Sequence, residues 1–262
     1  MNINDLTITS LETITGFALN TGAYLFTLDE LQDATIANTQ DTQDITGKGG
    51  RKLAKLKRNK AVTISGNNGM VSGGLLEMQT GSSFTNGATE IVHADYLTVK
   101  DNKATTSFKA IGTAGAEIID LFIRNSDGTR GDSLEQAATA ASGKFAYAPA
   151  TKELTFTGVA DGTEIVVHYT RKIVADVLKN ESDVYSGKCS LYIDAYAENK
   201  CGKVYHVQFY IPKADFSGEF SIEMGDNQTV HAFEAEALAG ACGAGGVLWT
   251  YTVFGDDTED AA

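Results

Sequence analysis

The sequence predicts a mainly β protein, built of antiparallel β-sandwich or barrel-like sheets with one or two short helices. Runs rich in β-branched and aromatic residues recur along the 262-residue chain, and turn-forming dipeptides separate them at short intervals. The 27 glycines, against two prolines, fit many tight turns between strands. With 42% hydrophobic residues, the chain can bury a sizeable core without disulfides.

The first two thirds of the chain contain clear strand and turn signals. Strands are expected at residues 23–28, 60–65, 90–99 and 118–124. Glycine follows Asn68, Asn86, Asp127 and Asp161, and such pairs tolerate the positive φ of hairpin turns. Residues 152–157 and 163–169 predict the clearest hairpin, with Leu154 and Phe156 on one buried face.

The C-terminal third predicts a meander. Strands are expected at residues 189–196, 204–211, 216–224, 229–235 and 247–254, followed by an acidic tail at 256–262. Alternation of apolar and polar residues in these runs is typical of a sheet with one wet face.

Helical signals are few. Residues 73–81, bounded by glycines, predict a two-turn helix, and residues 51–60 also fit a helical turn with Leu53 and Leu56 on one side. Ser133 and Gln136 have the spacing of a capping box, which predicts a short helix with Ser133 as its N-cap. Residues 171–179 fit either a helix or an extension of the preceding strand.

Charge is distributed unevenly. The net charge of −13 disfavours nonspecific binding to nucleic acid or to an anionic membrane. Residues 1–47 and 214–262 contain no Lys or Arg, so both ends of the chain are purely acidic. One short segment between them holds a third of the basic residues: Lys48, Arg51, Lys52, Lys55, Lys57, Arg58 and Lys60.

This basic segment has three interpretations. It is a solvated loop or helix face, or a contact arm that binds the acidic surface of an identical subunit, since opposite patches on one chain favour head-to-tail association. Nucleic-acid binding comes third, because the segment lacks aromatic residues for base stacking.

Patterns for catalysis, metals and cofactors give no positive signal. Residues 131–134 read Gly-Asp-Ser-Leu, the short motif of an esterase family, but no Asp-x-x-His segment supplies a base for Ser133. The histidines lack metal-ligand spacing and the glycines lack a phosphate-loop pattern, so no catalytic residue, metal or cofactor is expected. Cys189, Cys201 and Cys242 favour reduced thiols, although the first two could meet across a hairpin.

Targeting and membrane signals are missing from the sequence. The first residues have neither a basic nor an unbroken apolar region, and no run approaches the roughly 18 apolar residues of a membrane span. We expect a protein made in the cytoplasm, without membrane contact.

Five segments of the first third resemble the tail tube proteins of long-tailed bacteriophages. They are residues 22–26 and 33–37, the basic glycine loop at 45–51, the strand at 60–66 and the short helix at 75–81. Residues 144–171 also resemble a segment common in phage structural proteins.

The resemblance implies a non-enzymatic subunit that assembles as stacked hexameric rings and forms the tail tube of a virion in a bacterial host. DNA would pass through the tube without specific binding, since an acidic lumen repels phosphates. An extended loop, in the place of residues 48–60, would contact neighbouring subunits, and tape-measure and other tail proteins would be further partners. Because simple tube subunits are shorter, residues 104–181 are expected to be an inserted β unit in a tube-like domain made of residues 1–103 and 182–255.

Three alternatives stay open. The chain could be another virion component, such as a head decoration or a tail terminator, or an esterase that uses Ser133. A carbohydrate-binding β-sandwich is the third, for which Trp249 and the many tyrosines are the hint, although aromatic residues in strands more often pack in a core.

Overall fold

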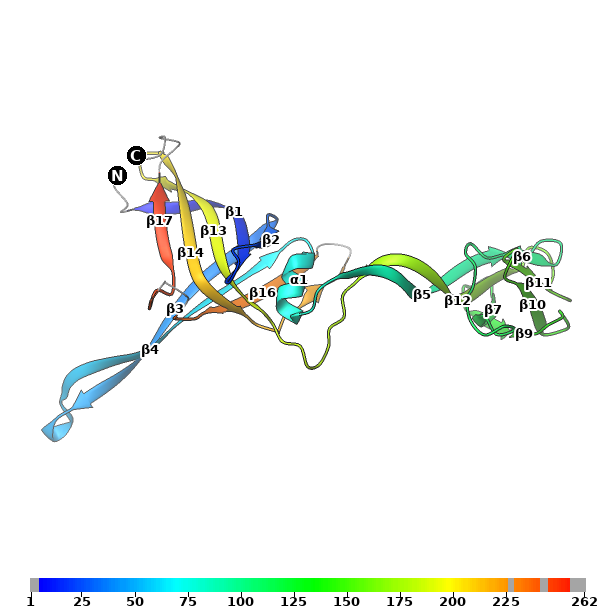
Figure 1. The fold of residues 1–262 in the computed structure, drawn as a ribbon, viewed down its shortest axis with the longest axis horizontal. Helices are drawn as coiled ribbons and strands as arrows, with labels where there is room; N and C mark the ends of the chain where they lie inside the picture. Colours follow the sequence, from blue (N-terminus) through cyan, green and yellow to red (C-terminus); the bar gives the residue numbers. More distant parts are fainter. Residues whose placement is uncertain (1–4, 226–228, 241–244, 255–262) are drawn as a thin grey trace. The chain divides into compact units, whose positions relative to one another are not determined.

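The computed structural model describes residues 5–225, 229–240 and 245–254 and confirms a mainly β fold with one α-helix in these ranges. The chain divides into two compact units (Figure 1). Met1–Phe84 and Leu178–Ala262 form the first unit, and Thr85–Val177 form the second. The inserted unit was expected at residues 104–181, whereas the second unit begins at Thr85 and ends at Val177. The difference at the first boundary arises because the long strand that starts at Thr85 pairs with a strand of the second unit. The acidic tail at 256–262 and Cys242 lie outside the described residues.

The first unit contains one nine-stranded sheet. Its strands are β1 (Leu6–Ala18), β2 (Tyr24–Leu28), β3 (Leu31–Thr46), β4 (Lys52–Asn68), β13 (Lys188–Asn199), β14 (Val204–Phe216), β15 (Ile222–Glu223), β16 (Val230–Ala237) and β17 (Thr250–Phe254). The strand order is β2-β1-β13-β14-β16-β4-β3, with β17 beside β14 and β15 beside β16. The antiparallel pairing of β13 with β14 confirms the hairpin predicted there.

Alternation along the strands gives this sheet two different faces. Every second residue of β13, from Cys189 to Ala197, is buried, while the residues between them are not. The buried face carries the core of the unit, and the helix α1 (Gly73–Thr80) adds Leu75 and Met78 to it. The predicted helix at 73–81 is therefore confirmed. It ends at Gly81, whose φ of 73° favours glycine and where a side chain would also collide with the carbonyl of Tyr185.

His231 attaches α1 to the sheet. Its fully buried ring accepts a hydrogen bond at Nδ1 from Ser72 N (3.3 Å), and its Nε2 lies 2.8 Å from Oε1 of Gln79. Because Ser72 N is a donor, Nδ1 is unprotonated and Nε2 donates to Gln79. Burial lowers the pKa of His231, which maintains this neutral form.

The second unit contains two four-stranded sheets around a common core. The strands are β5 (Thr85–Thr98), β6 (Lys103–Thr105), β7 (Ile118–Arg124), β8 (Arg130–Ser133), β9 (Glu135–Gln136), β10 (Lys144–Ala148), β11 (Glu153–Thr155) and β12 (Glu164–Val177). The sheets have the orders β6-β11-β10-β9 and β5-β12-β7-β8. Phe145 and Leu154 from the first sheet and Leu121 and Val167 from the second are buried in one cluster.

The predicted hairpin at 152–169 is wrong. β11 pairs with β10 and β6, whereas β12 pairs with β5 and β7. The turn between β11 and β12 carries the chain from one sheet to the other, so that Leu154 and Val167 enter the same core from opposite sides. Shared burial across two sheets outweighs pairing between sequence neighbours here.

Other local predictions also change in the structure. The helix expected after Ser133 is absent from the described residues, because Ser133 lies in β8 and pairs with Phe122 of β7. Residues 51–60 are part of β4, and residues 171–177 extend β12 as a strand. The strand expected at 216–224 is mostly not a strand. Phe216 is the last residue of β14, and within the rest of this range the strand residues are the two of β15.

Candidate subunit interface

Residues 38–61 form an arm that extends beyond the rest of the sheet in the first unit (Figure 1). β16 pairs with β4 from Thr63 to Asn68, so the earlier part of β4 has β3 as its strand partner. All residues of the arm are exposed except Gly47 and Ala61, which are half-buried. Because a lone two-stranded hairpin is marginally stable in water, this arm is a candidate for contact with another chain.

The arm has an apolar face and a basic face. Ile45 pairs with Ala54. Leu56, two residues after Ala54 in β4, lies on the same face and pairs with Gln43. Ile45 is 47% exposed and Leu56 38% exposed. The other face carries Lys55 and Lys57, opposite Asp44 and Thr42.

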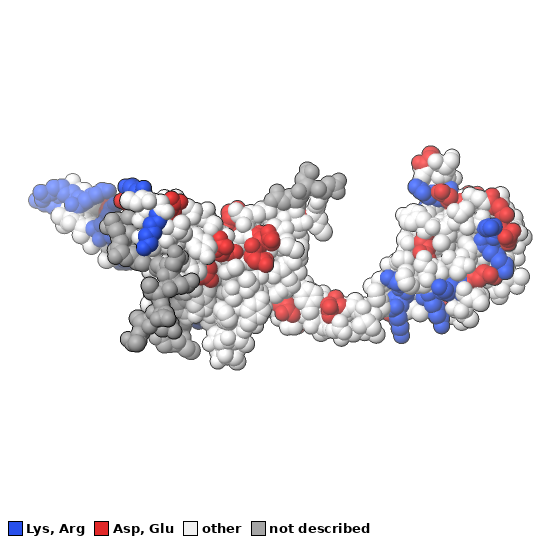
Figure 2. Space-filling view, turned by 90° about the horizontal axis from the view of Figure 1, so that it is seen from above, with Lys and Arg blue, Asp and Glu red and all other residues white. Residues whose placement is uncertain are grey.

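All seven basic residues predicted as contact residues lie on this arm, where Lys and Arg gather in Figure 2. Lys48 lies in the 3₁₀ turn η1 (Lys48–Gly50) at the tip, and Arg51 follows it. The others lie in β4: Lys52, Lys55, Lys57, Arg58 and Lys60. Lys52 forms an ion pair with Asp44, and the other six form none with a described residue. The arm thus holds a large uncompensated positive charge.

The root of the arm is fixed by Trp249. Its Nε1 donates a hydrogen bond to Oδ1 of Asn38 (3.3 Å), and its ring lies 5.9 Å from that of Phe209. The tryptophan packs against the core of the first unit and is not a free platform for a sugar ring. Trp249 therefore has a structural role at the root of the arm, and its presence no longer points to carbohydrate binding.

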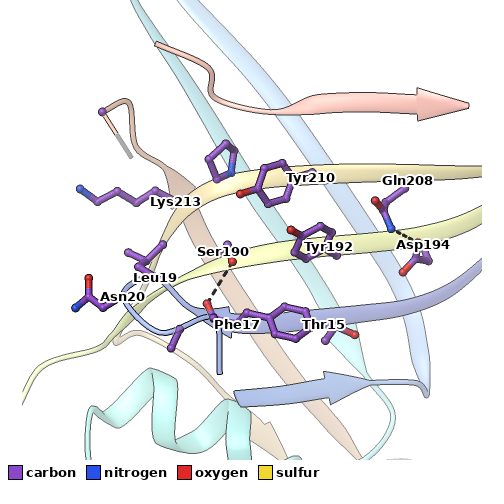
Figure 3. A pocket seen from close by; sticks show the side chains of 14 residues that line it. Thr15, Phe17, Leu19, Asn20, Ser190, Tyr192, Asp194, Gln208, Tyr210 and Lys213 are labelled. Carbon is purple, nitrogen blue, oxygen red and sulfur yellow. Dashed lines mark hydrogen bonds between the residues drawn. The ribbon is translucent and has the colours of Figure 1, made fainter. Parts of the chain in front are cut away.

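A second uncovered surface lies on the other face of the same sheet, and we call it the aromatic face. Four rings form a row across β2, β1, β13 and β14: Tyr24, Phe17, Tyr192 and Tyr210 (Figure 3 shows the last three). The ring centroids lie 6.3 Å apart for Tyr24 and Phe17, 5.5 Å for Phe17 and Tyr192, and 4.6 Å for the stacked Tyr192 and Tyr210. Three of these rings, those of Phe17, Tyr192 and Tyr210, line a hollow of about 820 Å³, which is within the range of ligand pockets.

Polar groups at the hollow hold the strands in register. Asp194 accepts a hydrogen bond from Nε2 of Gln208 (2.9 Å), and the Ser190 hydroxyl donates to the carbonyl of Phe17 (3.3 Å) (Figure 3). Burial, and next the neighbouring Tyr210, raise the pKa of the Tyr192 phenol, so this hydroxyl stays neutral. Lys213 lies at the rim. The hollow therefore offers aromatic rings and hydroxyl groups, together with the charged Asp194 and Lys213, to an incoming chain.

Sequence reasoning missed this surface. The signal was the alternation Ser190, Tyr192, Asp194 and Tyr196 in one strand and His206, Gln208 and Tyr210 in the next. It predicted strands but not that these residues share an uncovered face, because the row needs β1 beside β13.

Ser133 has the wrong neighbours for a nucleophile. Nη2 of Arg130 donates to Oγ of Ser133 and to Oδ1 of Asp120, both at 2.9 Å. His168 Nδ1 lies 4.0 Å from the other oxygen of Asp120. A catalytic triad needs the histidine between serine and aspartate, whereas here a guanidinium, which cannot accept a proton, occupies that place.

A second group of serine, histidine and aspartate is structural. Asp95 accepts hydrogen bonds from Oγ of Ser107 (2.8 Å) and from the hydroxyl of Tyr169 (2.7 Å), and its Oδ1 lies 3.2 Å from Nε2 of His93. The serine bonds directly to the carboxylate and not to the imidazole. These bonds hold the loop after β6 in place and assemble no nucleophile.

Metal and thiol chemistry find no support in the described residues. No group of three or more His, Cys, Asp or Glu could hold a metal ion within those ranges. Cys189 is buried and Cys201 is exposed, and both are free thiols. No described helix is long and apolar enough to cross a membrane.

The described residues thus form a β scaffold with two exposed surfaces, the arm and the aromatic face, that could contact another chain. The YomU/Tube protein family matches residues 6–248, so the chain belongs to this family. The match confirms the predicted resemblance to phage tail tube proteins and indicates a tube-like structural component of a virion tail. The comparison with curated proteins gives no match.

Proposed function

We propose that this chain is a self-assembling subunit of a phage tail tube, in which hexameric rings stack around a channel for DNA. The observation that carries the proposal is the arm, an exposed ribbon with a basic face and an apolar face in an otherwise acidic protein. Such a ribbon gains stability when another chain covers it. The tape-measure protein and other tail proteins are the expected further partners.

Charge supports assembly through the arm. Residues 38–61 contain seven basic and two acidic residues, which gives the arm a net charge of +5. Because the whole chain has a net charge of −13, the residues outside the arm carry −18. Arms repel one another and are attracted to the body of another copy, which gives a head-to-tail contact. Head-to-tail contacts close into rings or continue as helical arrays. The acidic body would also let DNA slide past without binding.

Charge reversal on the arm tests this function. We expect Lys55→Glu, Lys57→Glu and Arg58→Glu together to abolish the rings or tubes seen by negative-stain microscopy, with circular dichroism unchanged because these side chains are exposed. A matched control reverses three exposed lysines of the second unit, Lys100, Lys109 and Lys172, for the same change in net charge. Tubes from the arm variant, or a wild-type protein that stays monomeric at every salt concentration, would contradict the proposal.

A further inference from the structure

We infer that the aromatic face of one copy is the docking site for the arm of a second copy. The inference rests on the proposed function, because both need copies to associate, and it adds which surface receives the arm. The two surfaces that would meet are the apolar face of the arm around Ile45 and Leu56 and the hollow lined by Phe17, Tyr192 and Tyr210.

Both surfaces are uncovered in the isolated chain. Leu56 and Ile45 are exposed at 38% and 47%. The rings of Phe17, Tyr192 and Tyr210, which line the hollow, are half-buried, and the neighbouring ring of Tyr24 is 62% exposed. Burial of apolar area releases free energy in proportion to the area removed from water, and aromatic residues are enriched where chains meet. Joining the two surfaces removes both exposures at once.

Charge favours this occupant over the alternatives. A second arm is repelled, since each arm carries a net charge of +5. Within the hollow the carboxylate of Asp194 and the tyrosine rings attract cations. Lys213, which also lines the hollow, opposes this attraction, so the long-range attraction of the arm comes from the net charge of −18 on the rest of the chain. Arg58 lies on the same face of the arm as Leu56, so its guanidinium would enter the hollow together with the apolar side chains. Charge thus attracts the arm to the body of another copy, and the apolar residues decide where it binds.

Size also fits. A two-stranded ribbon is about 5 Å from strand to strand, and its side chains alternate between the faces. The hollow of about 820 Å³ accommodates several side chains of leucine size, and its lining comes from three strands and two turns. Ala54, opposite Ile45, has a small side chain that leaves the neighbouring apolar residues room to enter.

Photo-crosslinking in assembled protein tests the inference. With p-benzoylphenylalanine introduced at Ala54, at the centre of the apolar face, mass spectrometry of a mixture of isotope-labelled and unlabelled chains identifies contacts between copies. We expect crosslinks to residues 15–24, 190–194 and 208–213. The same probe at Lys57, on the opposite face, should give at least fivefold fewer crosslinks to these segments.

A substitution on the receiving surface gives an independent measurement. Tyr192→Ala should raise the protein concentration needed for assembly at least tenfold, measured by sedimentation, while Tyr96→Ala, at an exposed tyrosine of the second unit, leaves it unchanged. Circular dichroism and the unfolding temperature of the variant establish that the subunit is folded.

The outcomes separate the two proposals. Tubes whose arm crosslinks to the aromatic face support both. Tubes whose arm crosslinks elsewhere, for example to the exposed Glu234 and Glu236 of β16, or whose assembly tolerates Tyr192→Ala, overturn this inference and leave the tube function intact. Chains that never associate overturn both.

Discussion

Asp95 is the residue whose hydrogen bonds hold the loop after β6 in the second unit. It is 6% exposed and accepts bonds from the backbone nitrogen of Ser107 (2.7 Å), the Ser107 hydroxyl and the Tyr169 hydroxyl. Burial raises the pKa of its carboxyl, but the bonds from Ser107 and Tyr169 outweigh burial and hold the pKa below 3.8. Desolvation together with the bond to Asp95 raises the pKa of Tyr169 to about 12, so the tyrosine remains a donor.

Replacing this carboxylate tests its role. Asp95→Asn places an NH₂ group, which cannot accept a hydrogen bond, against the donors from Ser107 or Tyr169. We therefore expect the second unit to lose about 1–3 kcal/mol of stability. Because the folded pKa lies below the unfolded value, the stabilisation is present above about pH 3.8 and is lost as the pH falls through the folded value. Hydrogen exchange of residues 107–110 in the full chain measures both effects. Slow exchange in the variant, with unchanged pH dependence, would contradict them.

The arm is an element whose stability should depend on assembly. Its strands bury almost nothing, so in dilute monomer we expect amides of residues 39–46 and 52–60 to exchange within about tenfold of the rate in an unstructured peptide. In tubes the same amides become protected. Amides of β13, which pairs on both sides with β1 and β14, are protected in both states and serve as the control. An arm that resists exchange as a monomer would mean that it needs no partner.

Local sequence patterns were sufficient for some elements, and they failed where pairing or burial, rather than the local pattern, decides the structure. The β13–β14 hairpin and α1 have their partners or caps within a few residues, so local patterns sufficed. Residues 51–60 have leucines three apart, which fits a helix as well, and pairing with β3 makes them a strand. At the interface, composition located the basic residues because they are contiguous. The aromatic face could not be predicted, because Phe17 and Tyr192 are far apart in the sequence and meet only through the pairing of β1 with β13.

At the scale of the whole molecule, the two units have separate cores and the chain crosses between them at two places. No residue of one core cluster occurs in the other, within the residues that the structure describes. Thr85 and Val177, the first and last residues of the second unit, pair with each other at the end of the β5–β12 ribbon. Directly paired residues have Cα atoms about 5 Å apart, so a two-residue turn can join them.

Excision of the second unit should therefore leave the first unit folded. We expect a variant in which Asn-Gly replaces residues 86–176 to keep its unfolding temperature within a few degrees of that of the first unit in the full chain, because the nine-stranded sheet loses no strand. The arm and the aromatic face are both in the first unit, so the variant should still form tubes by negative-stain microscopy, and crosslinks from Ala54 should reach the same segments. A folded variant that stays monomeric would show that the second unit takes part in assembly. An unfolded variant would show that the two cores depend on each other.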